Sequence, residues 1–361
     1  MHCPGVAQHR SDQIGVDQLE HFETIADVLI DARSPGEFAQ DHIPGAINLP
    51  VLDDAERAEV GTLYAQVSPF AAKRVGAAMV ARNVARHLET HFADRPKDYR
   101  PLVYCWRGGN RSGAFTHVLR AVGWNAVQLA GGYKAYRERV RSDLESLSAG
   151  IRFIVVTGPT GVGKSRFLRA LAAAGGQVLD LEALAAHMGS VLGAHPDRPQ
   201  PPQKWFESKV WQALRRFDPT RPVFVESESR KIGNLHTPHA LLARMQTSEC
   251  IALEAERTLR VALLKEEYAH FLADAGALSA RLDCLTELRG KTTVERWKTL
   301  ARRGDWDTLI DALLVEHYDP AYQRSLGRNF PAALHAPPLR LSSIEPDDLD
   351  RLARTTLGAF A

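Results

Sequence analysis

The stretch IRFIVVTGPTGVGKSRFLRALAAAG, residues 151–175, combines three features that together specify a local fold. An apolar, β-branched run leads into a glycine-rich turn, and apolar residues at helical spacing follow the turn. The turn itself, GPTGVGKS at residues 158–165, matches the pattern G-x-x-x-x-G-K-[ST] in full. Because this pattern stands between a predicted strand and a predicted helix, it predicts a loop that binds phosphate groups.

Backbone N–H groups in a loop of this kind surround phosphate oxygens, and the lysine side chain neutralises part of their charge. The serine hydroxyl that follows the lysine is a ligand for Mg²⁺. We therefore predict that a diphosphate is bound by Gly158, Thr160, Gly161, Gly163, Lys164 and Ser165.

Acidic residues end two other predicted strands in this half of the chain. Glu226 and Glu228 end the run VFVESE, and Asp180 and Glu182 end LDLE. Open α/β sheets bind ligands at the carboxyl ends of their strands, so Asp180, Glu226 and Glu228 are candidates for holding a metal-bound water. The alternative is that these residues only end exposed strands. We predict no metal site built from protein ligands alone.

A second loop begins in LVYCWRGGNRSGAF, residues 102–115, where an apolar run ends at a cysteine. Glycines before a predicted helix point successive backbone N–H groups into one bowl, which binds an anion and favours a thiolate. Arginines add charge-assisted hydrogen bonds. The alternative is a buried structural cysteine. We predict instead that Cys105 is catalytic, and that an anion site is formed by Arg107, Gly108, Gly109, Arg111 and Ser112.

Strands and helices alternate along both halves of the chain. Short apolar runs predict strands within residues 26–35, 102–105, 123–132, 176–182, 222–228 and 249–255. Helical spacing separates them, which predicts parallel α/β sheets, and the chain becomes helical after Glu256. We predict a first α/β domain at residues 12–140, a helical connector at 141–150, and a phosphate-loop α/β domain with a helical C-terminal part at 151–361.

Composition is that of an ordinary globular protein of two domains: 361 residues, 45% hydrophobic, 24% charged and a net charge of +2. The near-neutral balance does not mark the whole chain as a nucleic-acid binder, although local basic faces remain compatible with it. The cysteines, Cys3, Cys105, Cys250 and Cys284, include no C-x-x-C pair, which argues against a disulfide framework or a structural zinc site. No signal peptide or long apolar run is recognisable, so we expect a cytoplasmic protein without a membrane partner.

The first half resembles the rhodanese domain. LIDARSPGEFAQDHIPGAINLP, residues 29–50, places Asp31, Arg33, Glu37 and His42 in register with that family, and YCWRGGNRS matches its active-site loop. The resemblance implies a cysteine that carries a transferable sulfur as a persulfide. Five residues separate the cysteine from the closing arginine, one more than in ordinary sulfurtransferases, so the loop resembles those of rhodanese-like phosphatases that fit a tetrahedral oxyanion.

The two halves together resemble the tRNA 2-selenouridine synthase family. The phrases that carry this resemblance run in order along the chain: AERAEVGTLYAQVSPFAAKRVGA, CWRGGNRS, GPTGVGKS, LDLEALAAHMGS, QPPQKWFES, VESESRKIG and HYDPAY. Departures from the family pattern are AAHMGS, where the family usually has an asparagine and a basic residue, and Asn110 in the cysteine loop.

This resemblance implies a fold and a reaction. The fold is a rhodanese-like parallel-sheet domain followed by a P-loop NTPase-like α/β domain. The reaction modifies 5-substituted 2-thiouridine at the wobble position of tRNA, with the anticodon region as the partner. Geranyl diphosphate first alkylates the 2-thio group, and selenium from selenophosphate then replaces the geranylthio group. Cys105 either carries selenium as a perselenide or only binds and activates selenophosphate. We expect no tightly bound cofactor, with Mg²⁺ accompanying the diphosphate.

Two segments, residues 136–142 and 289–304, are locally basic and are candidates for contacting RNA. Phosphate contacts set affinity, and an aromatic side chain can stack on a splayed base. In the second segment the candidates are Arg289, Lys291, Arg296, Trp297, Lys298, Arg302 and Arg303. The alternative is a solvated helix face.

Two other readings of the chain compete with the tRNA-modifying transferase. The first is a cysteine-dependent phosphatase or arsenate reductase, or a sulfurtransferase domain, coupled to a nucleotide-binding domain. Tyr104, in place of a histidine before the cysteine, and the lack of a recognisable acid for the leaving group weaken the phosphatase reading. The second is a non-enzymatic carrier or scaffold switched by a nucleoside triphosphate.

Overall fold

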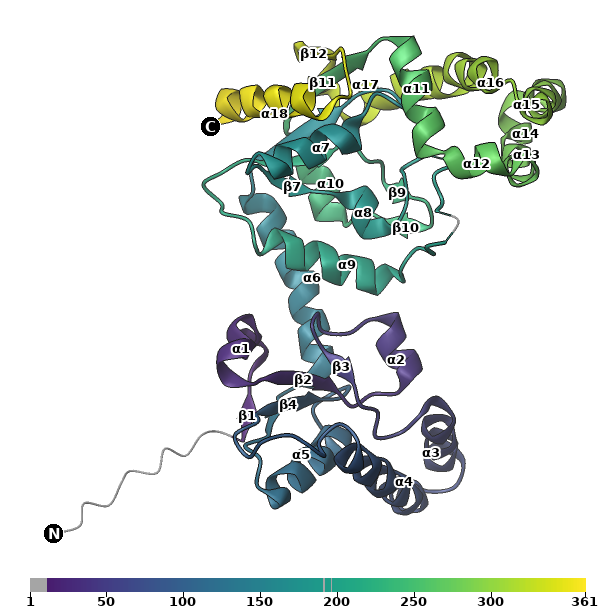
Figure 1. The fold of residues 1–361 in the computed structure, drawn as a ribbon. Coiled ribbons are helices and arrows are strands. Elements are labelled where there is room, and N and C mark those ends of the chain that lie inside the picture. The colour runs from purple at the N-terminus through teal and green to yellow at the C-terminus, as the bar shows by residue number, and fades with distance from the viewer. Residues whose placement is uncertain (1–11, 191, 196) are drawn as a thin grey trace. The chain divides into compact units, whose positions relative to one another are not determined.

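The computed structural model describes residues 12–190, 192–195 and 197–361 (Figure 1). Cys3 and the N-terminal stretch, in which we expect no signal peptide, lie outside these residues. The chain forms two compact units that meet between Asp143 and Leu144. Each unit is described by itself below.

The first unit contains a five-stranded parallel sheet with the strand order β1-β5-β4-β2-β3 (Figure 1). Its strands are β1 (Gln13–Ile14), β2 (Val28–Asp31), β3 (Ile47–Asn48), β4 (Pro101–Tyr104) and β5 (Val127–Leu129). Its helices are η1 (Val16–His21), α1 (Phe22–Ile25), α2 (Pro35–Gln40), α3 (Asp54–Gln66), α4 (Pro69–Glu89) and α5 (Asn110–Val122). Helix α6 (Gly132–Gly150) crosses the boundary between the units.

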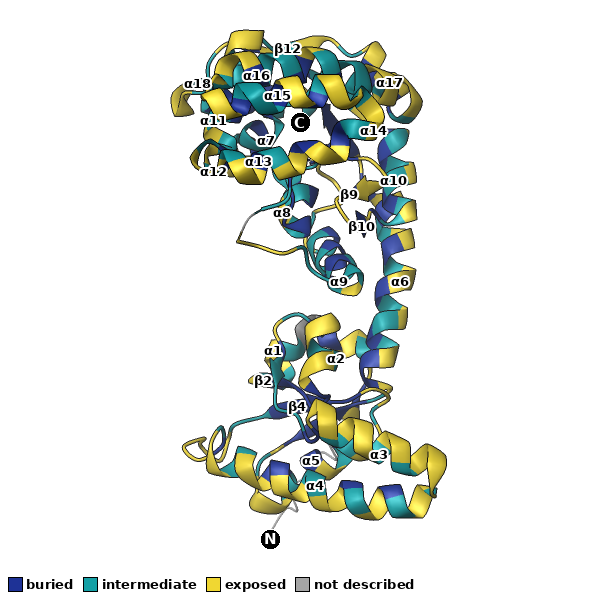
Figure 2. Ribbon diagram, turned by 90° about the vertical axis from the view of Figure 1, so that its right-hand side faces the viewer, coloured by how far each residue is buried: buried dark blue, intermediate teal, exposed yellow. Residues whose placement is uncertain are grey.

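The core of the first unit places the cysteine loop at one edge of its sheet. β4 is buried at all four positions, which Figure 2 shows in dark blue, and α5 covers it with Phe115 and Leu119, four residues apart on one helix face. In the register of β2 with β4, Asp31 lies opposite Tyr104. Because parallel strands end at the same edge, the segments that follow these two strands meet there, and Cys105 is the first residue after β4.

The second unit contains another five-stranded parallel sheet, with the order β12-β11-β6-β8-β7, and a separate antiparallel pair, β9 with β10. Its strands are β6 (Phe153–Thr157), β7 (Gln177–Leu179), β8 (Val223–Glu226), β9 (Lys231–Ile232), β10 (Leu235–His236), β11 (Glu249–Ala255) and β12 (Pro338–Leu341). The helices between its strands are α7 (Lys164–Ala173), α8 (Leu181–Ala185), α9 (Gln203–Leu214) and α10 (His239–Gln246).

The part that follows β11 is mainly helical, as the sequence predicts. Its elements are α11 (Arg257–Glu267), α12 (Ala269–Ala273), α13 (Ala275–Leu282), η2 (Asp283–Leu285), α14 (Thr286–Arg289), α15 (Lys291–Arg303), α16 (Trp306–Leu313), the π-helical turn η3 (Leu314–Tyr318), α17 (Asp319–Asn329), η4 (Pro331–Leu334) and α18 (Pro346–Phe360). The chain returns to the sheet at β12, which pairs in parallel with β11.

Two apolar clusters stabilise the second unit. One lies between the sheet and helices α7 and α18, and it contains Phe167, Phe224, Leu341 and Leu349. The other joins α13, α15 and α16 around Trp297. The predicted fold class, a rhodanese-like parallel-sheet domain and a P-loop α/β domain with a helical C-terminal region, is confirmed.

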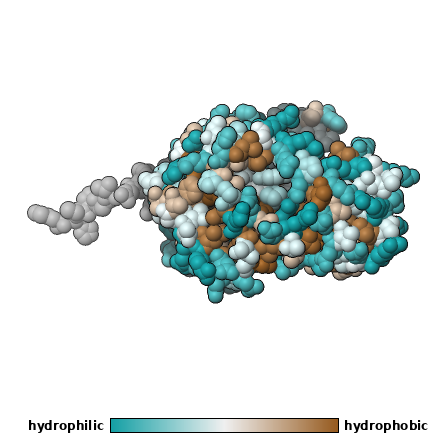
Figure 3. Space-filling view, turned by 90° about the horizontal axis from the view of Figure 1, so that it is seen from above, coloured by the Kyte–Doolittle hydropathy of each residue, from teal (hydrophilic) through white to brown (hydrophobic). Residues whose placement is uncertain are grey.

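The surface carries apolar side chains in small groups. On the face drawn in Figure 3, brown apolar groups are separated by teal hydrophilic side chains. Among the residues that the structure describes, no helix is both long enough and apolar enough to cross a lipid bilayer.

Candidate functional site

The cysteine loop closes on the first turn of α6. The N–H of Tyr133 donates to the carbonyl of Cys105 at 2.8 Å, and the N–H of Lys134 donates to that of Trp106 at 2.8 Å. Gly108 and Gly132 have positive φ, and a Cβ on Gly132 would clash with the carbonyl oxygen of Cys105. Glycine at both positions therefore lets the loop and the helix approach closely.

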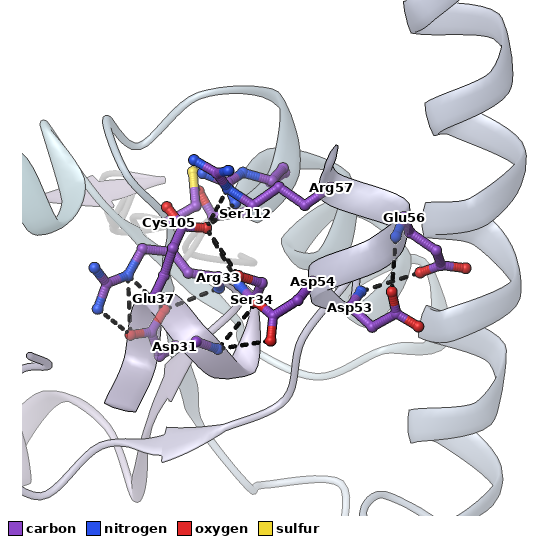
Figure 4. Close-up of polar contacts among 12 residues, drawn as sticks. Asp31, Arg33, Ser34, Glu37, Asp53, Asp54, Glu56, Arg57, Cys105 and Ser112 are labelled. Atoms are coloured by element: carbon purple, nitrogen blue, oxygen red, sulfur yellow. Dashed lines mark hydrogen bonds and ion pairs between the residues drawn. The ribbon is translucent and has the colours of Figure 1, made fainter. Parts of the chain in front are cut away.

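Cys105 lies inside this loop and is only 3% exposed. The hydroxyl of Ser112 donates to Sγ at 3.1 Å, as Figure 4 shows. Gln128, on β5, donates from Nε2 to the Ser112 hydroxyl at 2.8 Å and to the carbonyl of Gly108 at 2.7 Å. The hydroxyl donor and the N-terminus of α5 place hydrogen-bond donors around this sulfur, which suits a site that receives an anion.

A carboxylate lies beside the cysteine loop and binds its closing arginine. Oε2 of Glu37 accepts from Nε of Arg57 at 2.9 Å (Figure 4). It also accepts from Nη1 of Arg111 at 2.9 Å. Burial opposes ionisation of Glu37, but Arg111 and Arg57 outweigh it and lower the pKa of this carboxyl. Arg107 is exposed and makes no hydrogen bond or ion pair within the described part of the chain. An arriving oxyanion would thus meet one free arginine and one that already holds a carboxylate.

Buried polar residues support the loop from beneath. Arg33 pairs with Asp31, with 2.6 Å between Nη2 and Oδ2, and stacks on the ring of Tyr133 at 3.8 Å from the centroid. The hydroxyl of Tyr133 donates to Asp41 at 2.7 Å. Tyr104 is fully buried and its hydroxyl accepts from the N–H of Ile43 at 3.1 Å, so it cannot protonate a leaving group at the sulfur. Burial raises the pKa of Tyr104 well above its ordinary value.

The phosphate loop joins β6 to α7. Gly158, Gly161 and Gly163 all have positive φ, which only glycine adopts without strain. Nζ of Lys164 donates to the carbonyl of Gly158 at 2.9 Å, so the lysine folds over the loop. The carbonyl of Thr160 accepts from Nη2 of Arg260 at 2.8 Å, and Arg260 also pairs with Asp319 on α17. The loop is therefore held from the helical C-terminal part.

Carboxyl groups gather beside Ser165. The serine hydroxyl donates to Oε2 of Glu182 at 2.7 Å, and the backbone N–H of Glu182 donates to Oε1 of Glu226 at 2.7 Å. Oε2 of Glu226 is buried and has no partner among the described residues. Burial raises the pKa of Glu182 and of Glu226, and it raises the pKa of Glu228 to about 8, with the neighbouring Glu182 charge adding to the effect. Glu228 and Glu182 form a hydrogen-bonded pair.

All three predicted acidic candidates lie near one another. Glu226 and Glu228 belong to this group, and the charge of Asp180 adds to burial in raising the pKa of Glu226. Oδ1 of Asp180 also caps α8 by accepting from the N–H of Ala183 at 2.7 Å. Within the ranges that the structure describes, no three His, Cys, Asp or Glu side chains are grouped so that they could hold a metal ion.

A cavity of about 530 Å³ opens over the phosphate loop. Its wall includes Lys164, Ser165 and Glu228 on one side and the aromatic residues Tyr322 and Phe330 on another. A second pocket, of about 60 Å³, shares four wall residues with it: Thr160, Leu264, Tyr268 and Tyr318. The rest of the second pocket is lined only by aliphatic and aromatic side chains, namely Leu192, Phe271, Leu272, Leu278, Trp306, Leu309, Ile310, Leu313 and Leu314. An anion site and an apolar pocket are thus adjacent.

Comparison with known proteins assigns the chain to a family. The family model of the tRNA 2-selenouridine synthase AAA domain matches residues 151–283, and the rhodanese-like domain model matches residues 16–139. The tRNA 2-selenouridine synthase of Nitrosomonas europaea is 37% identical over 72% of this chain and 68% of its own length. The proteins of that name from Cupriavidus necator and Shewanella denitrificans are 36% and 33% identical, covering 81% and 85% of this chain and 87% and 93% of their own lengths. The chain belongs to the tRNA 2-selenouridine synthase family.

Membership of the tRNA 2-selenouridine synthase family confirms the resemblance drawn from the sequence, and it makes the chain an enzyme of that kind. The cysteine loop falls in the rhodanese-like match and the phosphate loop falls in the AAA match. The roles of the individual residues in the two loops stay predictions.

The basic segment around α15 has fewer side chains free to contact RNA than the sequence predicts. Trp297 is fully buried in the α13–α15–α16 cluster, so its predicted stacking on a base is wrong. Arg296 pairs with Glu316, Lys298 with Asp283 and Glu295, and Arg302 lies near Glu295, while Arg289 donates to His317. Lys291 and Arg303 are exposed and make no hydrogen bond or ion pair within the ranges described above. Three of the six cations here, Arg296, Lys298 and Arg302, already face carboxylates.

Three contacting residues went unrecognised as site residues in the sequence: Arg57, Gln128 and Arg260. Glu182 carried a signal, because it ends the LDLE run, but its bond to Ser165 depends on how α8 follows β7. Gln128 and Arg260 reach their loops only through the sheet order and the helical packing, for which no local motif exists.

Proposed function

We propose that the chain converts 5-substituted 2-thiouridine at the wobble position of tRNA to 2-selenouridine in two stages. In the first, the thiocarbonyl sulfur attacks C1 of geranyl diphosphate, a C–S bond forms, the C–O bond to diphosphate breaks, and the base loses its N3 proton to the solvent. In the second, selenium of selenophosphate attacks C2 of the base and geranylthiolate leaves. Water then cleaves the Se–P bond to release phosphate, and its two protons go to N3 and to the thiolate.

The observation that carries this proposal is the apolar pocket beside the phosphate loop. A nucleotide bound by its phosphates would direct a base with several hydrogen-bonding groups along the cavity, whereas a geranyl chain needs no polar partner. The pocket, at about 60 Å³, equals the volume of roughly two water molecules and would take only the far end of the chain. The remaining carbons would lie in the larger cavity near Tyr268 and Tyr318. Each buried CH₂ contributes about 0.8 kcal/mol.

The phosphate loop is suited to the first stage. Negative charge grows on the departing diphosphate as the allylic C–O bond breaks, and the loop N–H groups and Lys164 would stabilise that charge. Ser165 and the Glu182 carboxylate, which are 2.7 Å apart, fit a Mg²⁺ ion, since magnesium commonly takes one or two protein ligands together with phosphate oxygens. The ion would supply further charge neutralisation. We propose no tightly bound organic cofactor.

The cysteine loop is suited to the second stage. Selenophosphate is a tetrahedral anion, and the loop offers the start of α5, Arg107 and Arg111 around a sulfur that accepts a bond from Ser112. Cys105 would bind and activate selenophosphate without forming a covalent bond to selenium, because a perselenide would need a two-electron oxidant that selenophosphate does not supply.

Mass analysis of nucleosides tests the whole proposal. Thiolated tRNA is incubated with the protein, geranyl diphosphate and selenophosphate, and then digested. We expect the geranylthio nucleoside when selenophosphate is omitted, the selenonucleoside when both donors are present, and unchanged thiouridine when geranyl diphosphate is omitted. If either product required ATP or GTP but did not require geranyl diphosphate, the assignment of the phosphate loop to geranyl diphosphate would be contradicted.

A further inference from the structure

Helix α4 has an unusual surface for a helix of the first unit. It buries only Ala72, Gly76, Asn83 and Val84, and the remaining positions are exposed or half-buried, as the yellow and teal ribbon in Figure 2 shows. Its exposed side carries four cations, Lys73, Arg74, Arg82 and Arg86, and the helix has no acidic residue before Glu89. Lys73 and Arg74 lie near the first turn of α4 and Arg82 and Arg86 about two to three turns further on, so cations stand on the exposed surface of the helix near both of its ends.

Three of these cations have no partner in the folded protein. Within the described part of the chain, Lys73, Arg74 and Arg82 make no hydrogen bond or ion pair, and Arg86 bonds only to the neutral side chain of Asn83. The basic segment at α15 is different, because there Arg296 and Lys298 already bind carboxylates. Free cations lose little on binding a phosphate, whereas paired ones must first give up an existing partner.

The tip of the α3–α4 hairpin exposes large apolar side chains beside this charge. Tyr64 is 59% exposed, Val67 is 66% exposed and Phe70 is 75% exposed. Large apolar side chains are usually more buried than this. Two of the three, Tyr64 and Phe70, carry aromatic rings that are exposed to solvent. Small exposed residues, Ala77, Ala78, Ala81 and Ala85, separate the cations along α4. Cations next to exposed rings are the combination that holds single-stranded nucleic acid.

The base of the hairpin adjoins the cysteine loop. Asn83 donates to Glu56 on α3 at 2.6 Å and to the carbonyl of Val51 at 3.2 Å, which fixes the end of α4 that carries Arg86 to the start of α3. Arg57, on that first turn of α3, binds Glu37 at the edge of the cysteine loop. From Phe70 to Arg86 the helix extends about 24 Å. The charged face thus leads from the neighbourhood of Cys105 to the aromatic tip.

We infer that the exposed side of α4 binds the phosphate backbone of the tRNA substrate, and that Phe70 at the hairpin tip stacks on an unpaired base. This inference rests on the proposed function, since it takes tRNA as the substrate. It moves the main RNA contact from the basic segment at α15 to the rhodanese-like unit, where the cysteine loop lies.

The salt dependence of tRNA binding tests the charged face. Fluorescence anisotropy of the full-length protein with labelled, unmodified tRNA is measured over a series of KCl concentrations, without geranyl diphosphate or selenophosphate. Each phosphate contact adds about 0.7–0.9 to the slope of log K against log salt. We expect the triple variant Lys73→Gln, Arg74→Gln, Arg82→Gln to lower that slope by about 2–3 and to bind at least tenfold more weakly. The matched triple variant at α15, Arg296→Gln, Lys298→Gln, Arg302→Gln, is expected to keep the wild-type slope.

The aromatic tip has its own test, which separates RNA from a protein partner. Phe70→Ala and Phe70→Leu should both weaken tRNA binding by about tenfold, because neither side chain offers a ring for stacking. A protein interface would instead tolerate the leucine. Any of three results would overturn the inference. The first is that the α4 variant binds tRNA as the wild type does, and the second is that only the α15 variant lowers the salt slope. The third is that the Phe70→Leu protein binds as the wild type does. Because no donor is present, these results do not depend on whether the nucleoside analysis yields selenouridine.

Discussion

Replacing Glu228 by glutamine removes a buried acid that we expect to be protonated at neutral pH. Burial and the neighbouring Glu182 raise the pKa of Glu228 to about 8 in the folded protein, whereas an unfolded chain titrates near the ordinary value of 4.5. Between these values the unfolded chain loses a proton that the folded protein retains. The stability of the second unit should therefore fall as the pH rises through this window, and Glu228→Gln should abolish that fall.

The magnitude follows from the difference between the two pKa values. A difference of one corresponds to about 1.4 kcal/mol, so the wild type should lose ~3–4 kcal/mol of unfolding free energy between pH 5 and pH 8 through this group. Because Glu182 shares the proton, this is an upper limit. The amide introduced by Glu228→Gln stays neutral and can still donate to Glu182, so the variant should be the more stable protein at pH 8 and nearly equal to the wild type at pH 4.

Pulsed hydrogen exchange along a urea series measures this in the full-length protein. Peptides that cover β6 and β8 report the unfolding free energy of the second unit separately from the first. The matched control is Glu287→Gln, since Glu287 is an exposed glutamate of the same unit with no recorded partner among the described residues. A gain at pH 8 of less than about 1 kcal/mol relative to the control would refute the reasoning.

The remaining predictions concern the two loops. Cys105→Ala should leave the fold intact and abolish selenium incorporation while geranylation continues, as nucleoside mass analysis would show; full selenation by this variant would refute the role of the sulfur. Lys164→Ala should stop geranylation, but the variant should still exchange selenium into tRNA that is already geranylated. If both stages failed and the wild-type rate depended on added nucleotide, the loop would instead bind ATP or GTP and control the whole enzyme. Arg107→Ala and Arg111→Ala should each raise the selenophosphate concentration needed, by the equivalent of roughly 1.5–3 kcal/mol for each lost contact, and the absence of an effect in both would contradict the anion site.

The local sequence pattern was sufficient to predict most strands of the two sheets. The strands predicted within 26–35, 102–105, 123–132, 176–182, 222–228 and 249–255 correspond to β2, β4, β5, β7, β8 and β11, because each is a short apolar run bounded by turn residues. β12 was not predicted. Its PLRL sequence has little strand signal of its own, and it is held by pairing with β11, more than eighty residues earlier in the chain.

The two candidate sites, like the sheets, could be predicted from the sequence only in part. Both loops were recognisable because their glycines, cysteine and lysine are adjacent in sequence, but the groups that surround them come from distant segments. The Glu37–Arg111 ion pair and the Gln128–Ser112 hydrogen bond exist only once the sheet is assembled. The error at Trp297 was avoidable, since Val294, Trp297 and Ala301 recur at the spacing of a buried helix face.

The position of β12 and α18 in the second unit has a consequence for synthesis on the ribosome. Leu341, Leu349 and Ala353 belong to the apolar cluster that also contains Phe167 and Phe224. The sheet that bears the phosphate loop therefore cannot be completed until β12 has left the exit tunnel, and its apolar cluster cannot be completed until residue 353 has left it. The first unit has all of its core residues by then and is expected to fold during translation. A nascent chain stalled between the two points should present a formed cysteine loop beside an unfinished phosphate loop, and chaperones would meet mainly the latter.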